Sequence, residues 1–161
     1  MDPGSDFNTV RDFATALLIG ALIGIEREKR KAESGAGATG GLRTFILIAL
    51  VGASAGWMSK AMSTPWVLVG SLAAVTMLVL AGYLVESRAK PNDLGLTTEV
   101  AAIATFLLGA MATIGHTALA VGLAIAAAAV LAYKQPLHGA VARLGWDDVF
   151  AGLRLLIASF I

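Results

Sequence analysis

Five long apolar stretches follow one another along the sequence, separated by short polar or glycine-rich segments. They predict helices over residues 9–27, 42–62, 66–86, 97–114 and 117–133. A helix that crosses the hydrocarbon core of a bilayer needs about 20 mostly apolar residues, and these stretches approach or reach that length. We therefore predict an all-α integral membrane protein with about five transmembrane helices.

The first stretch has an uninterrupted apolar part that covers only residues 13–25. At ~1.5 Å per residue this part reaches about 20 Å, which is less than the ~30 Å hydrocarbon core. We expect Arg11 and Arg27 to extend their side chains to the two membrane boundaries. Residues 28–42 carry charged side chains and then a run rich in glycine, alanine and serine, which predicts a flexible loop.

The end of the chain has a different pattern. After Asp147 and Asp148, which are good helix caps, apolar residues recur at helical spacing with Arg154 on the opposite face. This segment is either an amphipathic helix that lies in the membrane interface or the first half of a sixth span, and we favour the first. The chain then divides into a transmembrane domain, residues 1–136, and a cytoplasmic-side segment, residues 137–161.

Small residues recur every four positions on the first two predicted helices. They are Ala16, Gly20 and Gly24 on the first and Gly52 and Gly56 on the second. Small residues at this spacing let the backbone of another helix approach closely, which is how helices associate in lipid. We expect them to form a helix-association face, unless they are present only because alanine and glycine are abundant in this chain.

Composition indicates lipid rather than water around most of the chain. Of 161 residues, 57% are hydrophobic and only 14% are charged, which is too apolar for an ordinary soluble domain. A net charge of +1 gives no reason to expect a nucleic-acid partner. The sequence has no cysteine, and His116 and His138 lie too far apart to suggest a zinc site. Because no nucleophile–base or nucleotide-binding motif occurs, we do not expect an enzyme.

The basic residues are distributed unequally between the two sides of the predicted membrane domain. Two of them, Arg11 and Lys60, lie on one side. Nine lie on the other side, namely Arg27, Lys29, Arg30, Lys31, Arg43, Arg88, Lys90, Lys134 and Arg143. Cytoplasmic loops carry an excess of lysine and arginine, so this asymmetry predicts an amino terminus outside the cell and three basic segments in the cytoplasm.

The candidate chemistry lies on the predicted cytoplasmic side. The residues that we single out there are Glu26, Arg27, Arg43, Thr44 and Glu99. A carboxylate at the membrane boundary is costly to desolvate, so we expect Glu26 to pair with Arg43 across the hairpin of the first two helices. The alternative is that these charges only mark where the helices leave the bilayer.

Two kinds of ligand suit these residues, and the sequence does not choose between them. Glu26 and Glu99 could hold a hydrated Mg²⁺ or a proton, because hard cations prefer oxygen ligands. Arg43 and Thr44, with the backbone N–H groups of residues 40–42 at a helix start, could instead hold phosphate or another anion.

Two motifs resemble the membrane domain of the MgtC/SapB family. The first is the run Leu-Ile-Gly-Ala-Leu-Ile-Gly-Ile-Glu-Arg-Glu at residues 18–28, and the second is Gly-Leu-Arg-Thr-Phe at residues 41–45. The resemblance is specific over residues 16–53 and continues as a hydropathy match to about Tyr133. The positions that match the family's motifs are Glu26, Arg27, Arg43 and Thr44.

The sequence also departs from the family's pattern. Phe45 stands where a histidine is common. Virulence-type members have a soluble carboxy-terminal domain, whereas residues 137–161 are short and apolar. The run Thr97-Thr98-Glu99 looks more like members in which this domain is fused to further membrane helices.

The resemblance implies a multi-pass protein of the bacterial inner membrane that is tied to survival at low magnesium. One hypothesis is a self-associating protein, a dimer, that regulates membrane-protein partners through helix contacts along Ala16, Gly20 and Gly24. The alternative is a transporter or channel for a small ion such as Mg²⁺ that uses the charged residues of the cytoplasmic side.

Overall fold

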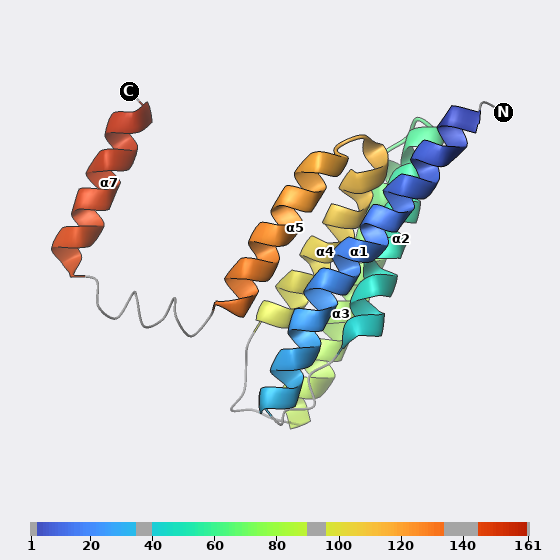
Figure 1. The fold of residues 1–161 in the computed structure, drawn as a ribbon. Helices are drawn as coiled ribbons and strands as arrows, with labels where there is room; N and C mark the ends of the chain where they lie inside the picture. The colour runs from blue at the N-terminus through green and yellow to red at the C-terminus, as the bar shows by residue number, and fades with distance from the viewer. Residues whose placement is uncertain (1–2, 35–39, 90–95, 134–144, 161) are drawn as a thin grey trace. The chain divides into compact units, whose positions relative to one another are not determined.

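The computed structural model describes residues 3–34, 40–89, 96–133 and 145–160, and every regular element in these ranges is a helix (Figure 1). The helices are α1 (Pro3–Ser34), α2 (Leu42–Ala61), α3 (Trp66–Ala89), α4 (Thr97–Ile114), α5 (Thr117–Ala132) and α7 (Trp146–Phe160). The predicted all-α fold is confirmed. The ends of α2, α4 and α5 lie within one residue of the predicted positions.

Helix α1 is longer at both ends than the sequence pattern predicts. It begins at Pro3, whose fixed φ suits the first turn of a helix, and it continues through Ser34. The prediction of a loop from residue 28 is therefore wrong for residues 28–34. Most of these residues are glutamate, lysine or arginine, which are good helix formers, so a change to charged side chains does not end the helix. The glycine-rich part of the predicted loop, residues 35–39, lies outside the described residues.

Four helices are long and apolar enough to cross a membrane, judged by length and composition. Their spans are Asp6–Arg30, Leu42–Ala61, Trp66–Arg88 and Thr97–Ile114, and the apolar helix α5 is shorter. The span in α1 covers 25 residues, about 37 Å at ~1.5 Å per residue, because the polar residues that flank its apolar centre are also helical. Its length therefore matches the bilayer better than the apolar centre alone.

The chain forms two compact units, residues 1–128 and residues 129–161. The first unit holds α1 to α4 and most of α5, and the second holds the last turn of α5 and α7. The domain boundary expected from the sequence, at residue 136, lies among residues 134–144, which the structure does not describe.

Helices α1, α2 and α4 pack against one another in the core of the first unit, and α2 is the main partner of the other two (Figure 1). The largest fully buried side chains are Phe45, Phe106, Ile23 and Thr105, all of which belong to these three helices. Helix α3 contacts α2 and α4. None of the most apolar 18-residue window of α3 is buried, so this helix turns most of its surface outward.

The turn between α4 and α5 is short because Gly115 adopts a left-handed conformation, with φ of +110°. The His116 N–H then bonds to the Met111 carbonyl oxygen at 3.1 Å, which closes the end of α4. His116 is exposed. At the other end of α4 the capping residue is Leu96, and no side chain caps the helix.

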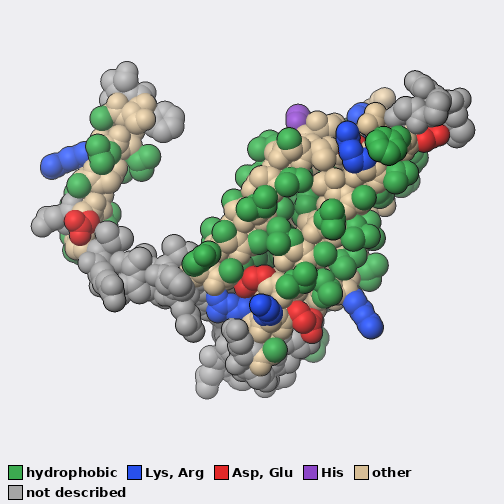
Figure 2. Space-filling model, in the orientation of Figure 1, with side chains coloured by type: hydrophobic (Ala, Val, Ile, Leu, Met, Phe, Trp, Pro, Cys, Tyr) green, Lys and Arg blue, Asp and Glu red, His purple; other side chains and the backbone are tan. Residues whose placement is uncertain are grey.

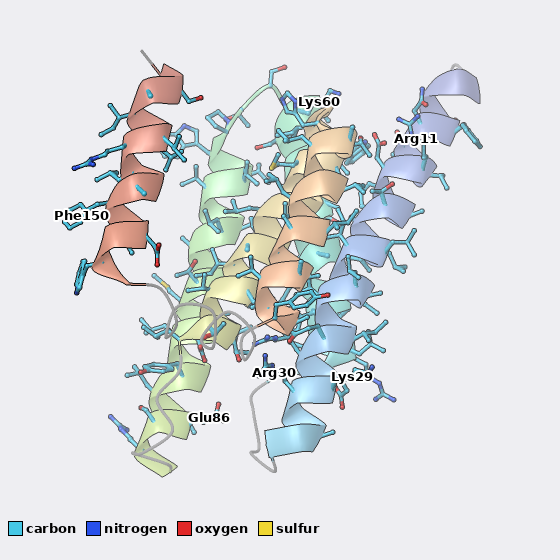
Figure 3. The ribbon with its side chains drawn as sticks, turned by 60° about the vertical axis from the view of Figure 1, so that its left-hand side comes forward. Arg11, Lys29, Arg30, Lys60, Glu86 and Phe150 are labelled. Atoms are coloured by element: carbon cyan, nitrogen blue, oxygen red, sulfur yellow. The ribbon has the colours of Figure 1, made fainter. Side chains whose placement is uncertain are left out.

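Charged side chains of the first unit gather at the ends of its helices, while hydrophobic side chains cover the middle on the face in view (Figure 2). Arg11 and Lys60 lie at one end of the first unit, and Lys29, Arg30 and Glu86 lie at the other (Figure 3). This arrangement follows from helices that alternate in direction, so that successive polar connections lie at opposite ends.

Helix α7 occupies the segment where the amphipathic helix was predicted. The Gly145 N–H donates to the Asp148 Oδ2 at 3.0 Å, so the Asp148 carboxylate caps the helix from its first turn. The rings of Trp146 and Phe150 lie one turn apart with centroids at 6.3 Å. The apolar side chains of α7 are exposed within the second unit, and whether they lie on or span a bilayer stays a prediction.

Candidate functional site

The small residues of α1 are buried against α2 of the same chain. Ala16 has no exposed surface. A Cβ atom added to Gly20 would lie 2.7 Å from the Phe45 carbonyl oxygen, and one added to Gly24 would lie 2.9 Å from the Leu42 Cα. The two backbones therefore touch at both glycines, as this spacing permits.

Gly52 and Gly56 of α2 have the same role toward α4. A Cβ on Gly52 would lie 2.0 Å from the Phe106 carbonyl oxygen, and one on Gly56 would lie 2.8 Å from the Ala110 carbonyl oxygen. The helix-association face of Ala16, Gly20, Gly24, Gly52 and Gly56 thus joins helices within one chain. It leaves no free surface for a second copy, which corrects the expectation that it mediates contacts with partners.

Glu26 is bound by two arginines of its own helix rather than by Arg43. The Arg27 Nε donates to the Glu26 Oε2, and the Arg30 Nε donates to the Glu26 Oε1 at 3.4 Å. The side chains of Glu26 and Arg27 are only 12% and 8% exposed. A buried charge is tolerated when it is paired and hydrogen-bonded, which these bonds achieve. The predicted pair between Glu26 and Arg43 is therefore wrong, because partners within the helix are closer.

The side chain of Glu28 forms a hydrogen bond between α1 and the start of α2. Its Oε2 accepts a hydrogen bond of 3.1 Å from the Leu42 N–H, the first residue of α2. A carboxylate is favourable at a helix N-terminus, where backbone N–H groups have no partner within the helix. The position predicted to bind phosphate or another anion is thus filled, at least at Leu42, by a carboxylate of the chain itself.

Arg43 and Thr44 lie in the first turn of α2 and are exposed. Arg43 forms no ion pair with another of the described residues. Thr44 lines a cavity, and this brings it together with one other predicted site residue, Glu99.

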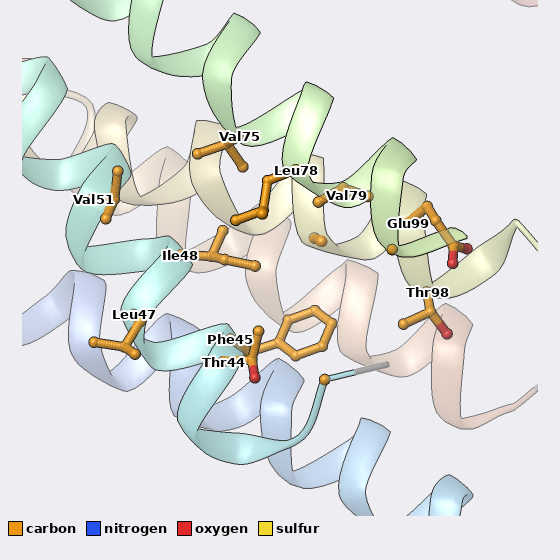
Figure 4. Close-up of a pocket in the computed structure, with 13 residues that line it drawn as sticks. Thr44, Phe45, Leu47, Ile48, Val51, Val75, Leu78, Val79, Thr98 and Glu99 are labelled. Carbon is orange, nitrogen blue, oxygen red and sulfur yellow. The ribbon is translucent and has the colours of Figure 1, made fainter. Parts of the chain in front are cut away.

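The cavity lies between α2, α3 and α4 and has a volume of about 370 Å³ (Figure 4). Its walls are mostly apolar and include Phe45, Ile48 and Val79, while Thr98 and Glu99 from the start of α4 line the same cavity. The Glu99 Oε2 is buried and accepts no hydrogen bond within the described ranges. Because an unpaired buried acceptor is destabilising, this oxygen marks a position in the cavity where a ligand could donate a hydrogen bond.

The described residues offer no ready-made metal centre. No group of three or more His, Cys, Asp or Glu side chains among them could hold a metal ion. Both oxygens of Glu26 already accept bonds from guanidinium groups, and these positive charges would repel Mg²⁺. Glu99 remains as a single carboxylate, and Mg²⁺ sites of one carboxylate complete their coordination with water.

The sequence reading missed Arg30, Glu28 and Thr98. Glu26 and Arg30 are four residues apart, a spacing at which oppositely charged side chains pair on a helix. This spacing could have identified Arg30 from the sequence. Glu28 and Leu42 are 14 positions apart, and no local pattern links them. Thr98 lines the cavity only because α4 starts beside α2 and α3.

The model of the MgtC family matches residues 13–140, which is most of the sequence and includes α2 to α5 and the larger part of α1. The chain belongs to the MgtC family. The resemblance inferred from the two motifs is confirmed. No match was found among curated proteins or among solved structures.

Membership of the MgtC family, together with the apolar helices, makes the chain a multi-pass membrane protein linked in general terms to magnesium homeostasis. The core of α1, α2 and α4 and the cavity with Glu99 both lie inside the matched region.

Proposed function

We propose that this MgtC-family protein is a regulatory protein of the bacterial inner membrane. It acts through helix contacts with a second copy of itself and with other membrane proteins. The outward face of α5 is the surface that we assign to these contacts. The observation that carries the proposal is the contrast between the glycines of the core and Gly122. A Cβ at Gly122 would meet nothing within 4 Å.

The open face of α5 has the spacing that helix association uses. Ala118, Gly122 and Ala126 recur every four residues, and all three are exposed. The same spacing brings backbones together in α1, α2 and α4, where the glycines are covered. Because lipid gives no hydrophobic driving force between helices, an uncovered stripe of this kind is suited to close contact with another helix.

The experiment is a comparison of two glycine substitutions at open positions. Gly122→Leu should convert a detergent-solubilised dimer to a monomer, measured by light scattering after gel filtration. Gly70→Leu on α3 is the matched control, since a Cβ there also meets nothing within 4 Å, and it should leave the dimer intact. A dimer that survives Gly122→Leu, or a wild-type protein that is monomeric at all concentrations, would contradict the proposal.

The charge distribution supports an amino terminus outside the cell. Lys29 and Arg30 lie at the end of the first unit opposite Arg11 and Lys60 (Figure 3), and Arg27 precedes them on the same helix. The positive-inside rule then favours the first group on the cytoplasmic side. A topology reporter fused at Lys60 should be active outside the cytoplasm, and cytoplasmic activity at this position would reverse the orientation.

Transport of a small ion such as Mg²⁺ is the second candidate function, and the unpaired Glu99 Oε2 is the observation that favours it. Ionisable groups inside membrane proteins often mark ion pathways. Liposomes that contain the protein and an entrapped Mg²⁺ dye give the test. Flux that is lost in Glu99→Ala would favour transport over regulation, and absence of flux at any gradient would remove this candidate.

A further inference from the structure

The cavity between α2, α3 and α4 has a polar end and an apolar remainder. Thr44, Thr98 and Glu99 lie near the first turns of α2 and α4, and Val51 and Val75 lie deeper along the helices (Figure 4). The polar end is therefore at the membrane boundary and the apolar part extends toward the middle of the bilayer. A membrane lipid has the same arrangement, with its polar head at the membrane boundary and its apolar tails toward the middle of the bilayer.

The cavity is open to the surroundings of the protein. Leu47 and Leu78, which line it from α2 and α3, are 62% and 74% exposed. Since α3 buries none of its most apolar window, it forms an outer wall of the first unit. An apolar chain can thus enter from the hydrocarbon core without leaving it. The volume of about 370 Å³ lies in the range of sites for small organic ligands.

One acceptor at the polar end has no hydrogen-bond partner among the described residues. The Glu99 Oε2 is buried and accepts no hydrogen bond from the residues that the structure describes. A carboxylate oxygen in this state calls for a hydrogen-bond donor, and a cationic N–H donor gives a stronger bond than a neutral one. Thr44 and Thr98 add hydroxyl groups at the same end, which suit the ester and phosphate oxygens of a lipid head.

We propose that this cavity binds an ethanolamine phospholipid from the surrounding leaflet, with its primary ammonium on the Glu99 carboxylate and an acyl chain along α2 and α3. The positive charge of the ammonium group complements the negative charge of the Glu99 carboxylate. A choline head carries the same charge but has no N–H group, so it cannot satisfy the oxygen. A hydrated Mg²⁺ would satisfy the carboxylate and leave the long apolar part of the cavity unexplained. This inference is independent of the role assigned to α5.

The test is native mass spectrometry of the delipidated protein with phospholipids that share acyl chains and differ only in the head. We expect the ethanolamine lipid to bind saturably at one site, about tenfold more tightly than the choline lipid, as for one charge-assisted hydrogen bond. Stepwise N-methylation of the head should reduce this preference. The methylation series uses only the wild-type protein, so it tests the proposal even if a variant fails to fold.

Two pairs of variants locate the site. Glu99→Gln should abolish the preference for ethanolamine over choline, whereas Glu86→Gln removes a carboxylate outside the cavity at the same end and should preserve it. Val79→Trp should fill the cavity and remove binding of both lipids. Leu80→Trp is its control, because Leu80 is 53% exposed and does not line the cavity.

Two results would overturn the proposal. The first is equal binding of the ethanolamine and choline lipids to the wild-type protein. The second is an unchanged preference in Glu99→Gln. Neither of these results depends on the oligomeric state, so failure here leaves the proposed role of α5 unaffected.

Discussion

Helices α4 and α5 follow each other through a turn of two residues and are both rich in alanine and glycine, but only α4 is enclosed. Half of the apolar window of α4 is buried. In α5 only Ala120 and Ala124 are buried. A Cβ on Gly109 of α4 would lie 2.1 Å from the Ala49 carbonyl oxygen, whereas one on Gly122 of α5 would meet nothing within 4 Å. Small residues therefore permit close packing, and the position of the helix decides whether it occurs.

The strongest test of this comparison is Gly109→Leu, which should destabilise the fold more than any other substitution discussed below. The added side chain must displace the α2 backbone at Ala49, and we expect a loss of at least about 3 kcal/mol. Unfolding by sodium dodecyl sulfate in mixed micelles, followed by circular dichroism, measures the loss. Gly122→Leu is the control and should unfold like the wild type when both are compared at protein concentrations low enough for the wild type to be monomeric. Similar stability of the two variants would show that α4 is no more tightly enclosed than α5.

The second test compares a buried arginine with an exposed one at the same end of the first unit. Arg27→Ala should lower the free energy of unfolding by about 3 kcal/mol, because it removes one partner of a buried ion pair with Glu26. Arg43→Ala removes an exposed side chain and should change it by less than about 0.5 kcal/mol. Equal effects in the same micelle assay would contradict the burial of Arg27.

A smaller effect is expected at the connection between α1 and α2. Glu28→Ala should lower stability by about 1 kcal/mol, because the Leu42 N–H loses its carboxylate acceptor. Lys29→Ala, at the adjacent exposed position, should have little effect. Hydrogen exchange at the Leu42 amide gives a direct reading and should become faster only in Glu28→Ala.

The smallest expected effect on stability concerns two buried threonines of α4. The Thr113 hydroxyl donates to the Ala53 carbonyl oxygen of α2 at 2.9 Å and also lies 3.0 Å from the Ala110 carbonyl oxygen of its own helix, whereas the Thr105 hydroxyl donates, among the described residues, only to Ala101 of its own helix. Thr113→Val should cost about 0.6 kcal/mol, the average for a hydrogen bond between membrane helices. Thr105→Val should be closer to neutral, and the reverse order would mean that the bond to α2 does not stabilise the core.

Much of the fold followed from hydropathy. The starts of α2, α3, α4 and α5 agree with the prediction because polar or glycine-rich segments precede each of them. The end of α1 was missed because its charged residues continue the helix past the membrane boundary. The predicted site was recovered only in part, since Thr44 and Glu99 share a cavity while Glu26 pairs within its own helix.

The sequence by itself determined that the chain is helical, that lipid surrounds it and that it belongs with the MgtC family. These properties depend on composition, on apolar runs of about 20 residues and on short local motifs. Only the tertiary structure decided which glycines are covered, that Glu28 caps α2, and that Glu99 faces an apolar cavity without a partner. Those contacts join residues far apart in the chain, so they depend on how helices pack and not on any local pattern.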